Sequence, residues 1–247
     1  SAGGTYSLVK DNSLSEILGK DNISLISQDG NINLNAWNRM NYFHSQKGMA
    51  LGLAALAGSL NNTTASAASK IQFGNNTEMI ALAGNITISS SINPLYKIYV
   101  SSEGGSWALS LAGTAVVLNG DLAADIQIGD NASLSAEEIF ITTDLEKITN
   151  QENSTTPNIV LEAKAAAYSG LGSLSGAFVK DSLAMDSTIS IGEGLNIMST
   201  DPQGRLVDTV TIATDNRLDI WNGNTGLAKE VWKWFPFIHI YCSKGGL

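Results

Sequence analysis

The residues best suited to chemistry are three aspartates that lie within ten positions of one another, Asp121, Asp125 and Asp130. Carboxylates on adjacent strands can hydrolyse a glycosidic bond, and carboxylates that hold Ca²⁺ beside a basic residue can serve a polysaccharide lyase. Asp186 and Lys70 occupy comparable positions elsewhere in the chain. Because all of these residues are typical of turns and exposed faces, we expect no catalysis and keep a polysaccharide-degrading lyase or hydrolase as the alternative.

The two histidines, His44 and His239, and the single cysteine, Cys242, lack the spacing of a metal site. Neither a Cys-x-x-Cys nor a His-Glu-x-x-His pattern occurs, and the Gly-rich nonapeptides of Ca²⁺-binding toxins are missing. We therefore expect no metal and no cofactor. A single cysteine also cannot form an intramolecular disulfide, which fits bacterial export better than a disulfide-stapled secreted domain.

An aromatic segment near the end of the sequence contains Trp232, Trp234 and Phe235. The open end of a repeat array exposes strand edges and core, so we expect residues 216–247 to leave the repeat register and cover that end as a cap. Pro236 supports the departure, because proline cannot donate to a central ladder. Two alternatives stay open, an aromatic surface that binds a glycan or a partner protein through these three residues, and the start of a further module.

The composition predicts a folded chain made of strands and turns. Hydrophobic residues make up 43% of the 247 residues and charged residues only 15%, whereas Asn, Ser and Thr together account for 67. Helical domains normally cover themselves with Lys and Glu, so this surface disfavours helix. A net charge of −9 with three arginines also leaves no basic surface for nucleic acid.

An apolar-x-apolar-glycine motif recurs along the chain at 71–74, 126–129 and 189–192, with a degenerate copy that ends at Gly19. The interval between successive motif glycines is the same from Gly19 to Gly74 as from Gly74 to Gly129, and it is longer from Gly129 to Gly192. The longer last interval predicts an insertion, which we place in the polar segment 150–157, because insertions in repeat arrays map to loops.

A second marker keeps a constant distance from the first, as expected of a true repeat. A leucine, a small residue and a glycine precede each of the last three motifs, and this glycine lies 16 positions before the motif glycine: Leu56-Ala57-Gly58, Leu111-Ala112-Gly113 and Leu174-Ser175-Gly176. The chain is therefore predicted to consist of units of about 55 residues.

Segments such as 22–25, 30–34 and 84–88 alternate apolar and polar residues, which predicts several short strands in each unit. The units lack the blade motif of a propeller and are shorter than the roughly 100 residues of a sandwich domain. We therefore expect a parallel β-solenoid with two or three coils per unit, stacked about 4.8 Å apart. The apolar run 48–60 is shorter than the roughly 20 residues of a membrane span. We interpret it as closely packed strand and turn, with a short buried helix as the alternative.

These repeats resemble the repeat region of the large leukotoxin-type filamentous adhesins and, more distantly, the filamentous haemagglutinins. The resemblance is carried by residues 126–136 and by the Gly/Ala-rich runs that end at Gly58, Gly113 and Gly176. It extends over residues 19–215. It implies a right-handed parallel β-helix shaft on a long secreted surface protein, with adhesion as its role.

Together these arguments predict an all-β, right-handed parallel β-helix with an irregular C-terminal cap. Its expected parts are a lead-in strand or preceding coil at 1–18, repeats at 19–215 with units that start near 19, 74, 129 and 192, and the cap at 216–247.

The chain is expected to be a structural and adhesive, non-catalytic segment on the bacterial cell surface. Its partner would be a glycan or protein of the host or a neighbouring cell, with neither nucleic acid nor a membrane span involved. A pure spacer shaft without a ligand is a second alternative. Because the chain begins without methionine, we also interpret it as a fragment or processed product.

Overall fold

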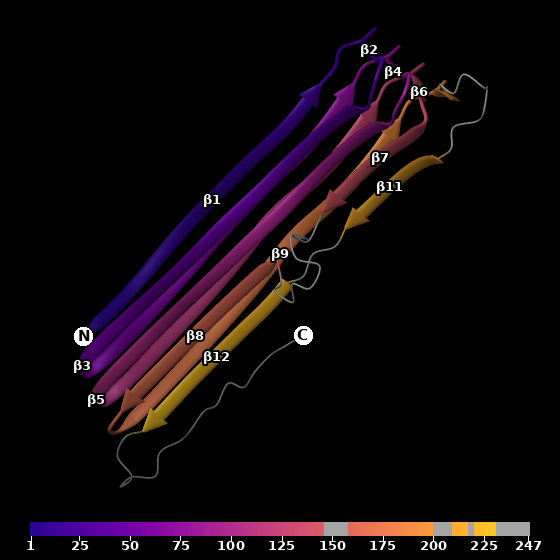
Figure 1. Cartoon of the computed structure of the whole chain (residues 1–247). Coiled ribbons are helices and arrows are strands. Elements are labelled where there is room, and N and C mark those ends of the chain that lie inside the picture. The colour runs from indigo at the N-terminus through magenta and orange to yellow at the C-terminus, as the bar shows by residue number, and fades with distance from the viewer. Residues whose placement is uncertain (146–157, 200–208, 217–219, 231–247) are drawn as a thin grey trace.

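The computed structural model describes residues 1–145, 158–199, 209–216 and 220–230, and within these ranges it contains strands and no helix. The long strands run side by side, and the short strands β2, β4 and β6 gather at the end of the molecule away from the N-terminus (Figure 1). The strands are β1 (Ala2–Leu18), β2 (Ser24–Ser27), β3 (Ile32–Phe73), β4 (Glu78–Ala81), β5 (Ile86–Ile128), β6 (Ser133–Ala136), β7 (Glu138–Leu145), β8 (Ile159–Ser169), β9 (Gly172–Ile191), β10 (Asn196–Ser199), β11 (Thr209–Asn216) and β12 (Ile220–Glu230).

Every pair of neighbouring strands is parallel, which confirms the all-β, parallel prediction. Ala2 of β1 pairs with Leu56 of β3, which in turn pairs with Leu111 of β5, so neighbours in the sheet are one whole repeat apart. The expectation of two or three coils per unit is therefore wrong. Each unit makes a single long circuit, because the period-two alternation continues on both sides of residues 51–54, the one interruption in the Gly/Ala-rich segment of β3.

Strands β3 and β5 each run out along the molecule and fold back. In β3 the fold-back coincides with a register irregularity at residues 52–54. Residues on its two sides face each other, since the Asn38 amide donates to the carbonyl oxygen of Ala68, and a Cβ on Gly48 would lie 2.6 Å from the carbonyl oxygen of Gly58. We call residues 32–52 and 86–106, with β7, β8, β11 and β12, the outbound sheet. Residues 54–73 and 109–128, with β1 and β9, form the return sheet.

The core lies between these two sheets and narrows toward the fold-back. Near the short strands it holds large side chains such as Ile71, Phe73 and Met79. Near the fold-back it holds alanines: Ala50, Ala55, Ala57, Ala112, Ala165 and Ala167. Facing sheets usually lie about 10 Å apart, and only small residues allow the closer approach seen at Gly48. The run 48–60 is therefore strand, and the helix alternative is wrong.

The turn that follows each strand of the return sheet is held by a ladder of hydrogen bonds from backbone N–H groups to side-chain oxygens. Asp21 Oδ1 accepts from the backbone N–H of Asn75 at 2.7 Å, and Asn75 Oδ1 accepts from that of Asp130 at 2.8 Å. Asp130 Oδ1 accepts in turn from the backbone N–H of Glu193 at 2.9 Å. Each unit thus satisfies a backbone donor of the next unit. Asp130 is therefore a structural residue of this ladder, which agrees with its interpretation as a turn residue.

The motif glycines Gly74, Gly129 and Gly192 occupy equivalent positions in these turns. A Cβ on Gly129 would lie 2.5 Å from the carbonyl carbon of Gly74, and a Cβ on Gly192 would lie 2.7 Å from that of Gly129. No larger residue fits so close to the preceding unit. Gly19 is the exception, because Leu18 pairs with Gln72 and Gly19 therefore stands one residue out of step with Gly74. The assignment of Gly19 to the same position is wrong.

The predicted insertion is confirmed by the register on either side of it. Ile92 and Tyr96 lie close together on β5, but Ile92 pairs with Leu145 whereas Tyr96 pairs with Ile159. The extra residues therefore enter within 146–158, in the middle of the outbound arm. Farther along, β12 pairs in parallel with β8, so strand pairing extends to Glu230, past the boundary expected at residue 216.

We expect Asn76→Val to destabilise the chain by about 1–2 kcal/mol relative to Asn76→Gly, because a β-branched residue is strained at positive φ. Asn76 has a φ of 58°, and its amide donates to Asn22 Oδ1 at 3.1 Å. Both variants lose that hydrogen bond, so their difference reports the backbone strain of valine less the entropy that glycine adds to the unfolded chain. Urea denaturation of the two variants measures it, and equal midpoints would contradict the turn geometry.

Candidate binding surface

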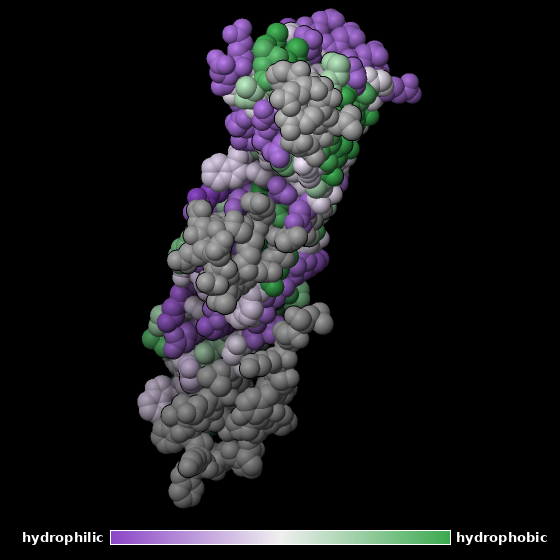
Figure 2. Space-filling model, turned by 45° about the vertical axis from the view of Figure 1, so that its right-hand side comes forward, coloured by the Kyte–Doolittle hydropathy of each residue, from purple (hydrophilic) through white to green (hydrophobic). Residues whose placement is uncertain are grey.

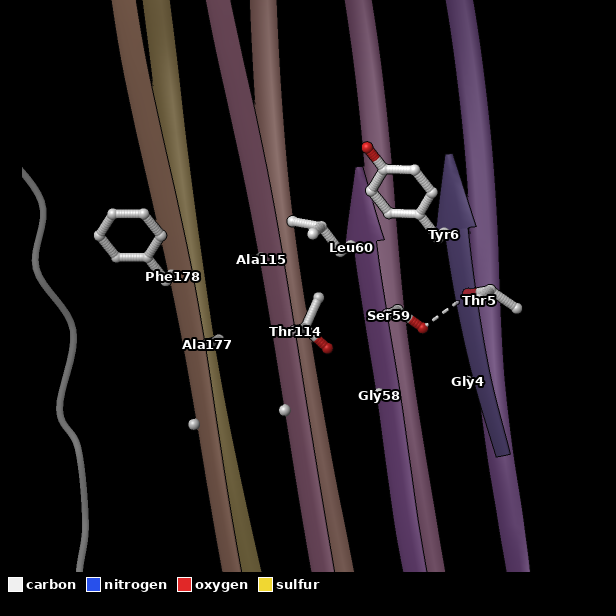
Figure 3. Close-up of a pocket in the computed structure, with 12 residues that line it drawn as sticks. Gly4, Thr5, Tyr6, Gly58, Ser59, Leu60, Thr114, Ala115, Ala177 and Phe178 are labelled. Carbon is white, nitrogen blue, oxygen red and sulfur yellow. Dashed lines mark hydrogen bonds between the residues drawn. The ribbon is translucent and has the colours of Figure 1, made fainter. Parts of the chain in front are cut away.

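A shallow apolar groove crosses the outer face of the return sheet near the fold-back and encloses about 730 Å³. Its floor is a row of glycines on four neighbouring strands, Gly4, Gly58, Gly113 and Gly176 (Figure 3). The repeat marker predicted the last three as equivalent residues, and the register confirms this. Gly4 in β1 is a fourth member that sequence reasoning missed. Its distance from Gly58, close to the distance between Gly58 and Gly113, was a signal that could have found it.

The folding of the chain does not require glycine along this floor. A Cβ on Gly58, Gly113 or Gly176 would find nothing within 4 Å, and on Gly4 the nearest atom would be 3.5 Å away. By contrast, a Cβ on Gly48, which faces the interior, would collide with backbone atoms. The floor glycines therefore leave space outside the molecule, and packing among the described residues does not explain them.

Two rows of apolar side chains, exposed or half-buried, flank the glycine floor. One row stands two residues after the glycines and includes Tyr6 and Phe178, which are 63% and 54% exposed, with Leu60 and Ala115 between them (Figure 3). The other row stands two residues before them: Ala2, Leu56, Leu111 and Leu174. None of the residues that line the groove is charged. A contiguous apolar surface of this kind is typical of an interaction site.

Apolar surface is not confined to the groove. Hydrophobic residues also gather at the end that carries the short strands, where Leu18, Ile26 and Leu82 are exposed (Figure 2). The exposed residues named there stand at different repeat positions and so form no row across the strands, which makes the groove the better defined candidate.

Hydroxyl groups on the inner side of the groove strands hold the two sheets together. Ser59 Oγ donates to the carbonyl oxygen of Ser101 at 2.7 Å, and Thr114 Oγ1 donates to that of Lys164 at 2.8 Å. Both bonds run from the return sheet to the outbound sheet. The groove is therefore built on a rigid support, because buried hydrogen bonds of this kind oppose sliding of one sheet over the other.

The aspartates singled out for chemistry do not converge. Asp121 and Asp125 stand four residues apart on β5, which is about 13 Å along a strand. Asp125 pairs with Lys70 on one side and Thr188 on the other, with Asp186 two residues away on β9. Burial raises the pKa of Asp125 and the Asp186 carboxylate raises it further, whereas Lys70 and the Thr188 hydroxyl lower it. The arrangement is a charged ladder on an outer face.

A buried polar cluster lies between the sheets, around Tyr96. Its hydroxyl donates to Asp11 Oδ2 at 3.1 Å, and its ring contacts Tyr42 with centroids 5.9 Å apart. Burial raises the pKa of both tyrosines, and the charge of Asp11 raises it further. Both phenols therefore stay protonated at neutral pH, and the Tyr96 hydroxyl has a structural role as a hydrogen-bond donor within the interior.

Of the other residues considered as candidate sites from the sequence, His44 is described by the structure and the rest are not. His44 stacks on Tyr42 with centroids 5.9 Å apart, and its Nε2 lies 3.0 Å from Gln46 Oε1. Trp232, Trp234 and Phe235 lie outside the described residues, as do His239 and Cys242. In the part of the chain that the structure describes, no group of three or more His, Cys, Asp or Glu side chains could hold a metal ion.

No protein-family model, curated protein or solved structure matches the chain. Within the described ranges, no helix has the length and apolar character that crossing a membrane requires.

We expect Gly48→Ala to destabilise the chain by about 1–3 kcal/mol, because the added Cβ would meet the Gly58 carbonyl oxygen at 2.6 Å. Gly58→Ala is the matched control in the same strand, and its Cβ points into open space, so we expect a change within about 0.5 kcal/mol. Urea denaturation of both variants tests this. If the two substitutions had equal effects, the floor glycines would be structural after all.

We expect Asp125→Asn to be at least as stable as the parent chain at neutral pH. The pKa of Asp125 is raised, so the folded chain binds this proton more tightly, and stability is lost as pH rises above the unfolded carboxyl value of about 3.9. Asparagine removes that loss, so the advantage of the variant should grow from about pH 3 to about pH 7 in urea denaturation. Lys70→Met is the control and should steepen the pH dependence, since Lys70 lowers this pKa. A variant destabilised at pH 7 would show that the attraction to Lys70 outweighs burial.

Proposed function

We propose that the chain is a right-handed parallel β-solenoid that forms a structural and adhesive, non-catalytic segment of a secreted bacterial surface adhesin. The parallel register supports the solenoid, since it advances by one repeat from each unit to the next. The handedness is supported by the general rule that about 98% of crossovers between parallel strands in one sheet are right-handed. The surface rich in Asn, Ser and Thr and the single cysteine support export.

The observation that carries the adhesive role is the glycine-floored groove. Its floor would accept larger residues without a clash with the described residues, yet four successive units have glycine there. The groove crosses the strands, so each added unit lengthens it. A rigid shaft with a groove along its length suits adhesion to a host or neighbouring cell.

A polysaccharide-degrading enzyme is the alternative favoured by one observation, the proximity of Asp125 to Asp186. A carboxyl group with a raised pKa is a property of the general acid in glycosidases. The pair lies on the outer face of the return sheet, whereas the groove that would hold a polysaccharide crosses β5 at Gly113, nearer the fold-back. The geometry therefore supports adhesion better than turnover.

We expect the purified chain to bind bacterial or host cells, and Gly58→Leu to weaken that binding by about tenfold or more, because leucine fills the groove. Ser66→Leu is the matched control, since Ser66 is exposed on the same face of the same strand and outside the groove. Flow cytometry with labelled protein measures the difference. If Gly58→Leu binds normally and substitution of Trp232 and Trp234 by Ala abolishes binding, the aromatic segment is the adhesive surface.

Two assays separate the adhesive role from its alternatives. Depolymerisation of a polysaccharide panel, lost in Asp125→Ala, would establish an enzyme and overturn the proposal. A chain that neither binds cells nor cleaves polysaccharide would be a pure spacer.

A further inference from the structure

We infer that the partner of the groove is the same groove of a second copy of this chain, packed face to face. The inference rests on the proposed adhesive role and names its ligand. A glycan is recognised through several hydrogen bonds, but of the four hydroxyl-bearing residues that line this groove, Thr5, Ser59 and Thr114 already donate within the chain, which leaves the Tyr6 hydroxyl. The surface therefore fits an apolar ridge better than a sugar.

The groove and the ridge that would fill it lie side by side on one face. The glycine floor and the row that contains Tyr6 and Phe178 both cross the same four strands, two residues apart, which is about 6.6 Å. A twofold axis that lies between the two copies, parallel to these rows and midway between them, exchanges them. It places the ridge of each copy over the floor of the other. Such a surface is self-complementary, as a twofold dimer interface requires.

This twofold axis places each strand over the same strand of the second copy, and the two strands run in opposite directions. The residues along the two rows fit this arrangement. Tyr6 of β1 then lies over the second copy's Gly4, and Phe178 of β9 lies over the second copy's Gly176. Between them, Leu60 of β3 lies over the second copy's Gly58. The bulky side chains of the ridge thus each meet a position without a side chain.

The neighbouring rows are also compatible. Leu8 faces Ala2 of the second copy, and Leu111 faces the second copy's Val117. The lysine nearest the rim, Lys180, faces the second copy's Leu174, so its alkyl stem packs on leucine while its ammonium group reaches solvent and meets no like charge. The two central rows are apolar, and the polar residues Asn62 and Lys180 stand in the outer row, as in the polar rim of specific interfaces.

The size of the contact predicts a weak, concentration-dependent dimer. The face spans about nine residues along four strands, which at about 3.3 Å per residue and 4.8 Å per strand is a footprint of roughly 570 Å² on each copy. The total of about 1,100 Å² is near the lower limit for a specific interface. Repetition of the groove along a longer shaft would add avidity.

The test is sedimentation velocity of the whole 247-residue chain over a concentration series in the micromolar range. We expect a reversible dimer, and Gly58→Leu should raise its dissociation constant about tenfold or more, because the added side chain collides with Leu60 of the second copy. Circular dichroism should be unchanged, because a Cβ at Gly58 meets nothing within the chain. Ser66→Leu should dimerise like the parent chain. A chain that stays monomeric throughout, or a dimer that Gly58→Leu leaves intact, would overturn the inference.

A charge exchange tests the packing directly. Leu60→Lys and Gly58→Asp should each abolish self-association, whereas an equimolar mixture should form a heterodimer, because the introduced lysine then faces the introduced aspartate. A mixture that stays monomeric would overturn the proposed register. The cell-binding assay separates this result from failure of the adhesive role. If Gly58→Leu loses cell binding although the parent chain is monomeric, the groove is adhesive and its partner is another molecule.

Discussion

The parallel register between successive units is the constraint on which the other features depend. Each residue of one unit lies beside its equivalent in the next, about 4.8 Å away, so every repeated feature becomes a row across the sheet. The Asp and Asn ladder of the turns, the glycine floor and the alanine-lined interior are all rows of this kind. A residue that suits one unit must therefore also suit the units on both sides of it.

The narrowing of the interior explains how glycine has two different uses in one segment. Facing inward, Gly48 allows the outbound and return sheets to approach within van der Waals contact of their backbones. Facing outward, Gly58 has open space above it and forms part of the floor of the groove. Within one stretch of strand, side chains an even number of residues apart share a face. The fold-back between Gly48 and Gly58 changes which face is inside, so one glycine faces the interior and the other faces solvent.

The interior combines apolar packing with polar contacts because it is long and narrow. Serine and threonine hydroxyls that face inward donate to carbonyl oxygens of the opposite sheet, as Ser59 and Ser69 do. Tyr96 reaches Asp11 across the core. Small residues with hydroxyl groups therefore suit both the limited space and the need to satisfy buried polar atoms.

Sequence patterns alone were sufficient for strand rather than helix, the repeat and the position of the insertion, because alternation and motif spacing are local properties of the chain. The prediction of several short strands in each unit was wrong, because β3 and β5 continue over 42 and 43 residues. They also identified Gly58, Gly113 and Gly176 as equivalent. The length of each circuit and the offset of Gly19 were decided by tertiary pairing, since one extra residue in a turn changes the register without changing the motif. Which glycines face solvent was likewise settled only by the fold-back, which places Gly48 against Gly58 and leaves the groove open on the outside.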